Sequence, residues 1–383
     1  MTREEFSTLL LPEVRQAIDA NIDRDPLQIA LDRRIVHARE VASQVKYLQR
    51  ARTKLPRLYE ARAIIPDRAF EQSSSEDCAV AKPLRGGRLL DLTCGLGIDS
   101  LTMAAHFEQV VALERDPVLA DVVRENMRRM GVENVEVVTT SDEEYVATCN
   151  EHFDWVYADP DRRTAEGRRV VRLEDCSPNM VALWPMLKRI TDRIAIKNSP
   201  LFDVDEAFRI FGECGVEVIS RGGECKEVNI YVDGRGARIA AEAVGRQRVE
   251  FARDEVVDKP CEGEFMAEEY GYLIVPDVAL QKARLVTHSL REVADVWSNN
   301  SFGFARMEPA NVLGRVEIIE RIETFDVKQL KRELKGRGVD IILRDFPMGV
   351  DEFRRKTGAK SGNEVRLALT KIKGKLYTIY LKK

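Results

Sequence analysis

Residues 88–97 read RLLDLTCGLG. An apolar run ends in Asp91, and Thr93, Gly95 and Gly97 then place small residues at every second position. This order predicts a buried strand, a tight turn and the first turn of a helix. Glycines in such a turn allow a ligand to lie against bare backbone, since a Cβ atom would collide with it.

The acid that precedes the glycines distinguishes two classes of ligand. The carboxylate of Asp91 would repel a pyrophosphate, whereas it favours a cationic ligand with an amino-acid end, such as S-adenosylmethionine (SAM). A dinucleotide site expects Gly-x-Gly-x-x-Gly, and Ser100 stands where the third glycine would be. The sequence therefore favours SAM over NAD or FAD, with a turn that binds no ligand as the third alternative.

Composition narrows the class of protein further. The chain has 383 residues, 44% of them hydrophobic, which predicts two or three domains. It contains no run of 18 apolar residues, so we expect no membrane span. Its first residues lack the apolar stretch of a signal peptide. Seven cysteines occur without a C-x-x-C pair, and the four histidines are isolated. We therefore expect reduced thiols, a cytoplasmic location and no metal site.

Charge is unevenly distributed along the chain. The net charge is −4, yet residues 325–383 contain 16 Lys and Arg against 7 Asp and Glu, which leaves the rest of the chain acidic. A basic module on an acidic body is typical of a nucleic-acid handle, and a solvated lysine-rich surface is the alternative.

Strand and helix patterns alternate over residues 84–235, which predicts a parallel sheet covered by helices. A helix is expected over 117–130, opened by Pro117 and closed by Gly131. The expected strands are 88–92, 109–114, 135–139, 153–158 and 193–197, with 216–220 and 228–232 as a terminal antiparallel pair. The fold class is therefore α/β, a Rossmann-like doubly wound sheet.

Four acids fall at or just after the ends of successive strands, namely Asp91, Glu114, Asp142 and Asp159. Ligands of such sheets bind at the carboxyl ends of the strands, so these groups should line one edge. Carboxylates packed together without partners repel one another, and a cationic, hydroxyl-rich ligand relieves that repulsion.

These motifs resemble those of class I SAM-dependent methyltransferases over roughly residues 70–235. The resemblance implies that Asp91 contacts the methionine end of SAM and that Glu114 holds both ribose hydroxyls. It also implies that Asp142 accepts a hydrogen bond from the adenine amino group, although Asp142 could instead cap the following helix. The remaining implied cofactor contacts are Gln72 and Ser74, before the first strand, and Thr93, Gly95, Gly97 and Asp159.

The acceptor side resembles the fourth motif of N-methylating relatives. Asp159, Pro160 and Asp161 are the candidate catalytic residues, because a carboxylate and a stiff carbonyl can orient a target amino group. Asp161 replaces the usual second proline and Arg162 the usual aromatic residue, which argues against stacking of an adenine here. Candidate substrate-binding residues are Arg162, Arg163, Lys197 and Asn198.

The two flanks complete the expected organisation. Apolar residues from Leu27 to Leu48 recur at helical spacing after the capping pair Asp25-Pro26, which predicts an N-terminal helical region over 1–80. The methyltransferase domain should cover 81–240. A small α+β domain of ferredoxin-like type is expected over 255–324, and a basic module over 325–383 resembles the THUMP-like domains of bacterial RNA methyltransferases.

The preferred hypothesis is a SAM-dependent methyltransferase that modifies structured RNA, tRNA or rRNA, at a base nitrogen by direct transfer. A non-catalytic RNA-binding protein on a methyltransferase scaffold is the first alternative, and the unusual segment after Asp159 favours it. A methyltransferase for a protein or a small molecule is the second. Cys176 lies in no recognisable signature of the methyltransferases that use a cysteine nucleophile.

Overall fold

A computed structural model describes residues 1–161 and 172–383. The predicted substrate residues Arg162 and Arg163 lie outside this described part. The chain divides into two compact units. Unit 1 comprises Met1–Gly215 with Glu227–Gly236, and unit 2 comprises Val216–Lys226 with Ala237–Lys383. The helices expected to form an N-terminal region thus belong to the same unit as the predicted methyltransferase sheet.

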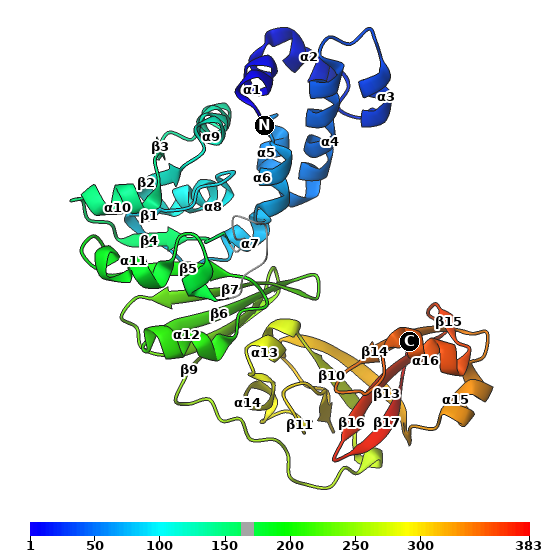
Figure 1. Cartoon of the computed structure of the whole chain (residues 1–383). Coiled ribbons are helices and arrows are strands. Elements are labelled where there is room, and N and C mark those ends of the chain that lie inside the picture. Colours follow the sequence, from blue (N-terminus) through cyan, green and yellow to red (C-terminus); the bar gives the residue numbers. More distant parts are fainter. Residues whose placement is uncertain (162–171) are drawn as a thin grey trace. The chain divides into compact units, whose positions relative to one another are not determined.

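The sheet of unit 1 has the strand order β3-β2-β1-β4-β5-β7 (Figure 1). The first five strands run parallel, and β7 is antiparallel to β5. The strands are β1 (Gly86–Asp91), β2 (Phe107–Glu114), β3 (Val135–Thr139), β4 (Trp155–Ala158), β5 (Ile194–Asn198) and β7 (Glu224–Val232). The helical segments between them are α8 (Ile98–Met103), η1 (Ala104–His106), α9 (Pro117–Arg129), α10 (Asp142–Thr148), η2 (Leu173–Asp175), α11 (Met180–Leu187) and α12 (Val204–Phe211). The predicted α/β class is confirmed.

Helix α9 shows why the pattern could be recognised in the sequence. Asp116 caps it, because its carboxylate accepts from the backbone N–H of Val118 at 2.8 Å, and Pro117 occupies the first helical position. Gly131 follows the helix with a φ of 68°. The helix buries Ala120, Val122, Val123 and Met127 on the face that packs toward the sheet.

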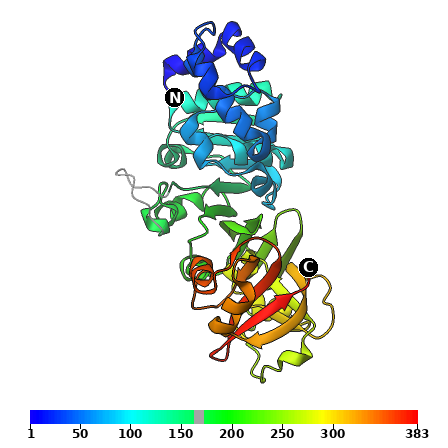
Figure 2. The ribbon, with the colours of Figure 1, turned by 90° about the vertical axis from the view of Figure 1, so that its right-hand side faces the viewer.

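Seven short helices precede the sheet: α1 (Arg3–Leu10), α2 (Pro12–Ala20), α3 (Pro26–Leu31), α4 (Ala38–Lys54), α5 (Pro56–Glu60), α6 (Asp67–Gln72) and α7 (Glu76–Val80). Figures 1 and 2 show α1 beside α9. The apolar residues of these N-terminal helices form one hydrophobic core with those of α9. Asn126 of α9 both donates to the carbonyl and accepts from the N–H of Ile64, each at 2.8 Å. These bonds fix the chain that leads to the cavity described below.

The expectation of a single apolar stripe from Leu27 to Leu48 was wrong at its beginning. Helix α3 ends at Leu31, and Leu27 and Leu31 are 75% and 83% exposed. The carboxylate of Asp32 accepts from the backbone N–H of Arg34 at 3.1 Å, a local bond that competes with helix continuation. His37, with a φ of 51°, then sets a new direction for α4, whose apolar face is buried.

Unit 2 contains two sets of strands. One set has the order β6 (Gly215–Arg221), β8 (Arg238–Ala243) and β9 (Gln247–Ala252). The other is an eight-stranded sheet of order β11-β12-β10-β13-β17-β16-β14-β15. Its strands are β10 (Tyr272–Pro276), β11 (Asp295–Val296), β12 (Gly303–Ala305), β13 (Gly314–Thr324), β14 (Gly338–Leu343), β15 (Lys360–Ser361), β16 (Val365–Ile372) and β17 (Lys375–Leu381). The helical segments are η3 (Ala267–Glu269), α13 (Val278–Lys282), α14 (Val286–Leu290), α15 (Val327–Leu334) and α16 (Val350–Thr357).

The two ranges expected to form separate C-terminal modules share this eight-stranded sheet. Strand β13 pairs with β10 on one side and with β17 on the other, so it belongs to both ranges at once. Helices α13 and α14 are separated at Arg284, whose φ is 56°. No helix in the described part of the chain has the length and apolar character needed to cross a membrane.

Candidate active site

Asp91, at the end of β1, stabilises the loop that follows this strand through hydrogen bonds. This residue is fully buried, and its carboxylate accepts from the backbone N–H of Thr93 at 2.9 Å and from the Ser100 hydroxyl at 2.5 Å. Burial raises the pKa of Asp91 to about 7. Ser100, which breaks the dinucleotide pattern, is thus a partner of this acid. Asp91 organises the loop and does not itself line the cavity above it.

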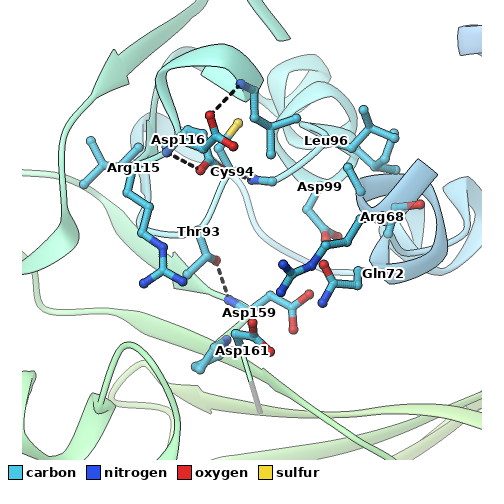
Figure 3. A pocket seen from close by; sticks show the side chains of 18 of the residues that line it. Arg68, Gln72, Thr93, Cys94, Leu96, Asp99, Arg115, Asp116, Asp159 and Asp161 are labelled. Atoms are coloured by element: carbon cyan, nitrogen blue, oxygen red, sulfur yellow. Dashed lines mark hydrogen bonds between the residues drawn. The ribbon is translucent and has the colours of Figure 1, made fainter. Parts of the chain in front are cut away.

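A cavity of about 990 Å³ opens in unit 1 at the carboxyl ends of the parallel strands (Figure 3). Ligand pockets for molecules the size of a nucleoside cofactor occupy several hundred Å³ or more. Its walls come from the loop after β1, the ends of β2 and β4, the start of α10, and the segment 66–74 before the sheet. The predicted edge of the sheet is therefore the site of a cavity large enough for such a ligand.

Glu114 ends β2 and lines this cavity. One carboxylate oxygen accepts from the backbone N–H of Gly95 at 3.0 Å, and the other accepts from that of Asp116 at 2.9 Å. Burial raises the pKa of Glu114. Each carboxylate oxygen has two lone pairs, so each can accept one further hydrogen bond from a ligand.

Asp142 lies at the start of α10 and is 9% exposed. Its Oδ2 atom is buried and has no hydrogen-bond partner among the described residues, although the residue lines the cavity. Burial, reinforced by the neighbouring Glu143, raises the pKa of Asp142 to about 6. The alternative that Asp142 caps the helix is wrong, because Ser141 is the capping residue and its hydroxyl accepts from the N–H of Glu144 at 3.2 Å. A buried acceptor without a partner costs free energy that a ligand donor would recover.

Asp159 follows β4 and also lines the cavity. Its backbone N–H donates to the Thr93 hydroxyl at 2.6 Å, and its Oδ2 atom contacts the Lys197 ammonium at 2.5 Å. Pro160 and Asp161 line the same wall, and the backbone of Asp161 forms a bridge with Ser177 through bonds of 2.7 and 3.0 Å. The three candidate catalytic residues therefore lie together at one end of the cavity.

The segment between α6 and α7 contributes the opposite wall. Gln72 and Ser74, two of the expected cofactor contacts, line the cavity, and Figure 3 shows Arg68 and Gln72 pointing into it from α6. The Ser74 hydroxyl donates to Asp99 at 2.9 Å and accepts from Lys197 at 2.6 Å.

Besides Asp91, three predicted site residues lie behind the wall. Gly97 does not line the cavity, and Lys197 and Asn198 are buried beside it. The Lys197 ammonium pairs with carboxylates, and the Asn198 amide donates to the carbonyl of Ile196 at 3.3 Å. Neither group is exposed in the manner expected of a residue that contacts an RNA phosphate.

Sequence reasoning missed several residues of this site. Asp99 lines the cavity and pairs with Lys82 at 2.7 Å, and Arg68 and Arg115 stand on its walls. Arg115 could have been predicted, because it directly follows Glu114 in the sequence. The pairing of Lys82 with Asp99 could not be predicted, because it depends on how α7 packs on α8.

The two loop glycines have different roles, and substitution should separate them. An added Cβ at Gly97 would lie 2.9 Å from Val123 Cγ1, whereas at Gly95, which lines the cavity, the nearest atom is 3.9 Å away. Both have positive φ. We expect Gly97→Ala to lower the free energy of unfolding in urea by about 2–4 kcal/mol. Gly95→Ala should cost only about 1–2 kcal/mol, yet weaken SAM binding more. Equal losses of stability would contradict this division.

Comparisons with known proteins indicate the class of protein to which this chain is similar. A family model described as THUMP domain-like matches residues 314–383, and one described as conserved hypothetical protein 95 matches residues 69–172. An uncharacterised S-adenosylmethionine-dependent methyltransferase of Mycobacterium tuberculosis is 26% identical over 329 residues, which cover 81% of this chain and 85% of that protein. The ribosomal RNA small subunit methyltransferase J of Coxiella burnetii is 31% identical over 126 residues, which cover 28% of this chain and 49% of that protein.

A solved structure resembles the whole chain. The crystal structure of a protein described as a putative methyltransferase from Porphyromonas gingivalis W83 has a TM-score of 0.84 and 25% identity, and the match covers 100% of this chain and 99% of that one. Fold, cavity and relatives agree that the chain is a SAM-dependent methyltransferase. Within that class, it is one whose C-terminus carries a THUMP domain-like segment.

Proposed function

We propose that this protein transfers the methyl group of SAM to a base nitrogen of a structured RNA, tRNA or rRNA. The observation that carries the SAM assignment is the buried Oδ2 atom of Asp142, which has no hydrogen-bond partner among the described residues, in a cavity that Glu114 also lines. An adenosine moiety offers complementary donors to both, an exocyclic amino group and a pair of ribose hydroxyls. SAM supplies an activated methyl group on a sulfonium.

The chain's own residues divide the work of binding. Glu114 would accept from the two ribose hydroxyls and Asp142 from the adenine amino group. Gly95 leaves room for the ligand to lie against the loop. Thr93, Gln72, Ser74 and Asp99 line the part of the cavity near Asp159, where the methionine end would lie. Asp91 and Gly97 act indirectly by shaping the loop.

At the acceptor end, Asp159, Pro160 and Asp161 would hold the target group. The carboxylate of Asp159 can accept from an amino group and orient its lone pair, and holding two reactants in line is worth up to about 7–11 kcal/mol of a barrier. Pro160 stiffens the backbone between the two acids. Arg162 and Arg163 remain candidates for contact with an RNA phosphate.

The raised pKa of Asp142 predicts a pH dependence of SAM binding. Protonation replaces a charge-assisted bond to the adenine amino group by a weaker one, so we expect affinity to fall about tenfold between pH 7 and pH 5. In the free protein the same shift has the opposite sign for stability. The folded state binds the proton of Asp142 more tightly than the unfolded state does. The contribution of Asp142 to the free energy of unfolding therefore increases as the pH falls from about 6 toward 4.

Calorimetric titration of SAM at several pH values measures the first effect. Asp142→Asn should weaken binding at pH 7 and make the pH dependence shallower. Glu144→Gln is the matched control, since Glu144 lies on the same helix but does not line the cavity. An unchanged pH dependence in Asp142→Asn would contradict the assignment of Asp142.

RNA is the proposed substrate class because a basic surface lies in the THUMP domain-like segment. Lys328, Lys331 and Arg332 of α15 and Lys335, which directly follows this helix, are exposed and line a shallow groove. Arginines and lysines that neutralise phosphates supply most of the sequence-independent affinity for nucleic acids. The ribosomal RNA methyltransferase among the relatives supports the same class. An RNA substrate also fits the cytoplasmic location expected from the cysteines.

Salt dependence tests the RNA interface. We expect Lys331→Gln with Lys335→Gln to weaken binding to total tRNA and to reduce the slope of log affinity against log salt by about 1–2. A double variant at two exposed cations of unit 1, Arg15→Gln with Lys188→Gln, should leave the slope unchanged. Equal slopes in the two double variants would count against α15 as the RNA-binding surface.

The function itself is tested by mass spectrometry of nucleosides from cells with and without the gene. One methylated nucleoside should disappear from the RNA of the deletion strain and return with the wild-type gene. SAM binding with no missing nucleoside would favour the non-catalytic RNA-binding alternative. Negligible, salt-insensitive RNA binding would favour a protein or small-molecule acceptor.

A further inference from the structure

A network of buried and partly buried charges borders the acceptor end of the cavity, and two of its carboxylates also line that cavity. It consists of two lysines, Lys82 and Lys197, and three carboxylates, Asp99, Asp159 and Glu227. Lys82 contacts Asp99 at 2.7 Å and Glu227 at 3.1 Å, and Lys197 contacts Asp159 at 2.5 Å and Asp99 at 3.7 Å. The side chains of Lys82 and Lys197 are only 1% and 10% exposed.

Buried ions of this kind need a specific reason. Removing a charge from water costs several kcal/mol, and an ion pair seldom repays more than that cost. Burial alone would lower the pKa of Lys197, but the carboxylates of Asp159 and Asp99 raise it well above its usual value. Likewise, burial alone would raise the pKa of Asp99, but Lys82 and Lys197 hold it well below its usual range. The carboxylates of Asp99 and Glu227 likewise raise the pKa of Lys82, so both lysines stay charged although they are buried.

Lys197 differs from Lys82 in what it connects. Its ammonium binds the Asp159 carboxylate and, at 2.6 Å, the hydroxyl of Ser74. It thereby joins the end of β4 to the segment between α6 and α7, two walls of the cavity that are far apart in the sequence. Lys82 contacts Asp99 and Glu227 and, among the contacts in the described part of the chain, has none with Asp159.

We propose that Lys197 is a positioning residue for methyl transfer, which holds the Asp159 carboxylate in one orientation and ties it to the Ser74 wall. This role rests on the proposed function of Asp159. Lys197 engages Oδ2 of Asp159, and the described residues provide no partner for Oδ1, so Oδ1 is the oxygen that we expect to meet an acceptor group. Lys82 has a separate role, to balance the charges of Asp99 and Glu227.

A double-mutant cycle tests this role. The variants are Lys197→Met, Asp159→Asn and the two together, assayed by transfer of tritium-labelled methyl from SAM to total RNA of a strain that lacks the gene. We expect Lys197→Met to lower kcat about 100-fold while the Kd for SAM changes less than about threefold. The double variant should be little worse than Asp159→Asn alone, because residues that act as a unit are not additive.

Two comparison variants separate positioning from stability. Lys197→Arg keeps a cation of similar reach and should recover kcat to within about tenfold of wild type. Lys82→Met removes an equally buried cation and should lower the melting temperature comparably, yet leave kcat within about threefold. Similar kcat losses in Lys82→Met and Lys197→Met, or multiplicative losses in the cycle, would overturn the proposal.

Hydrogen exchange tests the positioning role of Lys197 without any measurement of methyl transfer. Hydrogen exchange of the free protein should show faster exchange in peptides covering 70–75 and 155–161 for Lys197→Met, but not for Lys197→Arg. Unchanged exchange in both segments would overturn the positioning role. If wild-type protein transfers no methyl group while exchange responds as expected, the proposed function fails and the structural tie of Lys197 stands.

Discussion

Replacing Glu114 by alanine should lower the affinity for SAM by at least about 100-fold. Each hydrogen bond from a ribose hydroxyl to an ionised carboxylate contributes about 1.5–3 kcal/mol, and Glu114 can accept two of them. The change also leaves the N–H groups of Gly95 and Asp116 without their acceptor, which loosens the loop beneath the ligand. Calorimetric titration at neutral pH measures the loss.

Glu108→Ala is the matched control for this prediction. Glu108 lies on the same strand, β2, but it is exposed at the other end and does not line the cavity. It should bind SAM as the wild type does. The affinity of Glu114→Gln for SAM should lie between those of Glu108→Ala and Glu114→Ala, because an amide keeps the shape of the carboxylate but not its charge. Wild-type affinity in a well-folded Glu114→Ala protein would contradict the proposed ribose contact.

The second large effect is expected at Asp159. Asp159→Asn should lower kcat by about 100- to 1,000-fold, within the range that a positioned carboxylate contributes to proton handling or orientation. The Kd for SAM should change less than about threefold, because the proposed cofactor contacts of Glu114 and Asp142 are intact. Single-turnover transfer of labelled methyl to RNA separates the chemical step from binding.

Asp192→Asn serves as the control for this change, since Asp192 is an almost fully exposed carboxylate whose only ionic neighbour in the described residues is His152. Asp161→Asn should have a smaller effect than Asp159→Asn, because the backbone of Asp161 is fixed by its bridge to Ser177 whatever its side chain. Equal and large effects on SAM affinity and kcat would place Asp159 in the cofactor site instead of the acceptor site.

Much of this site could be predicted because its signals are local. Each of the acids Glu114, Asp142 and Asp159 follows an apolar run, and the rule that parallel strands end at one edge brings them together. All three line one cavity. The parallel strands of unit 1 and helix α9 were also recognisable, since apolar runs, capping residues and turn glycines are encoded within a few residues.

What could not be predicted depends on packing between distant segments. Position 97 must be glycine because a Cβ atom there would collide with Val123 of α9. The ammonium of Lys197 is bound by Asp159 and Ser74. Neither contact can be recognised from the neighbouring sequence. The helix that was expected to continue past Leu31 was interrupted by a side-chain bond of Asp32. The sharing of β13 between two C-terminal ranges follows from long-range strand pairing, which periodicity does not reveal.

The most direct test is a crystal structure of the full chain with S-adenosylhomocysteine. We expect the ribose hydroxyls within hydrogen-bond distance of Glu114, the adenine amino group on Oδ2 of Asp142, and the sulfur atom facing Asp159. A ligand bound elsewhere, or one that leaves Asp142 without a partner, would contradict the assignment of this cavity as the SAM site.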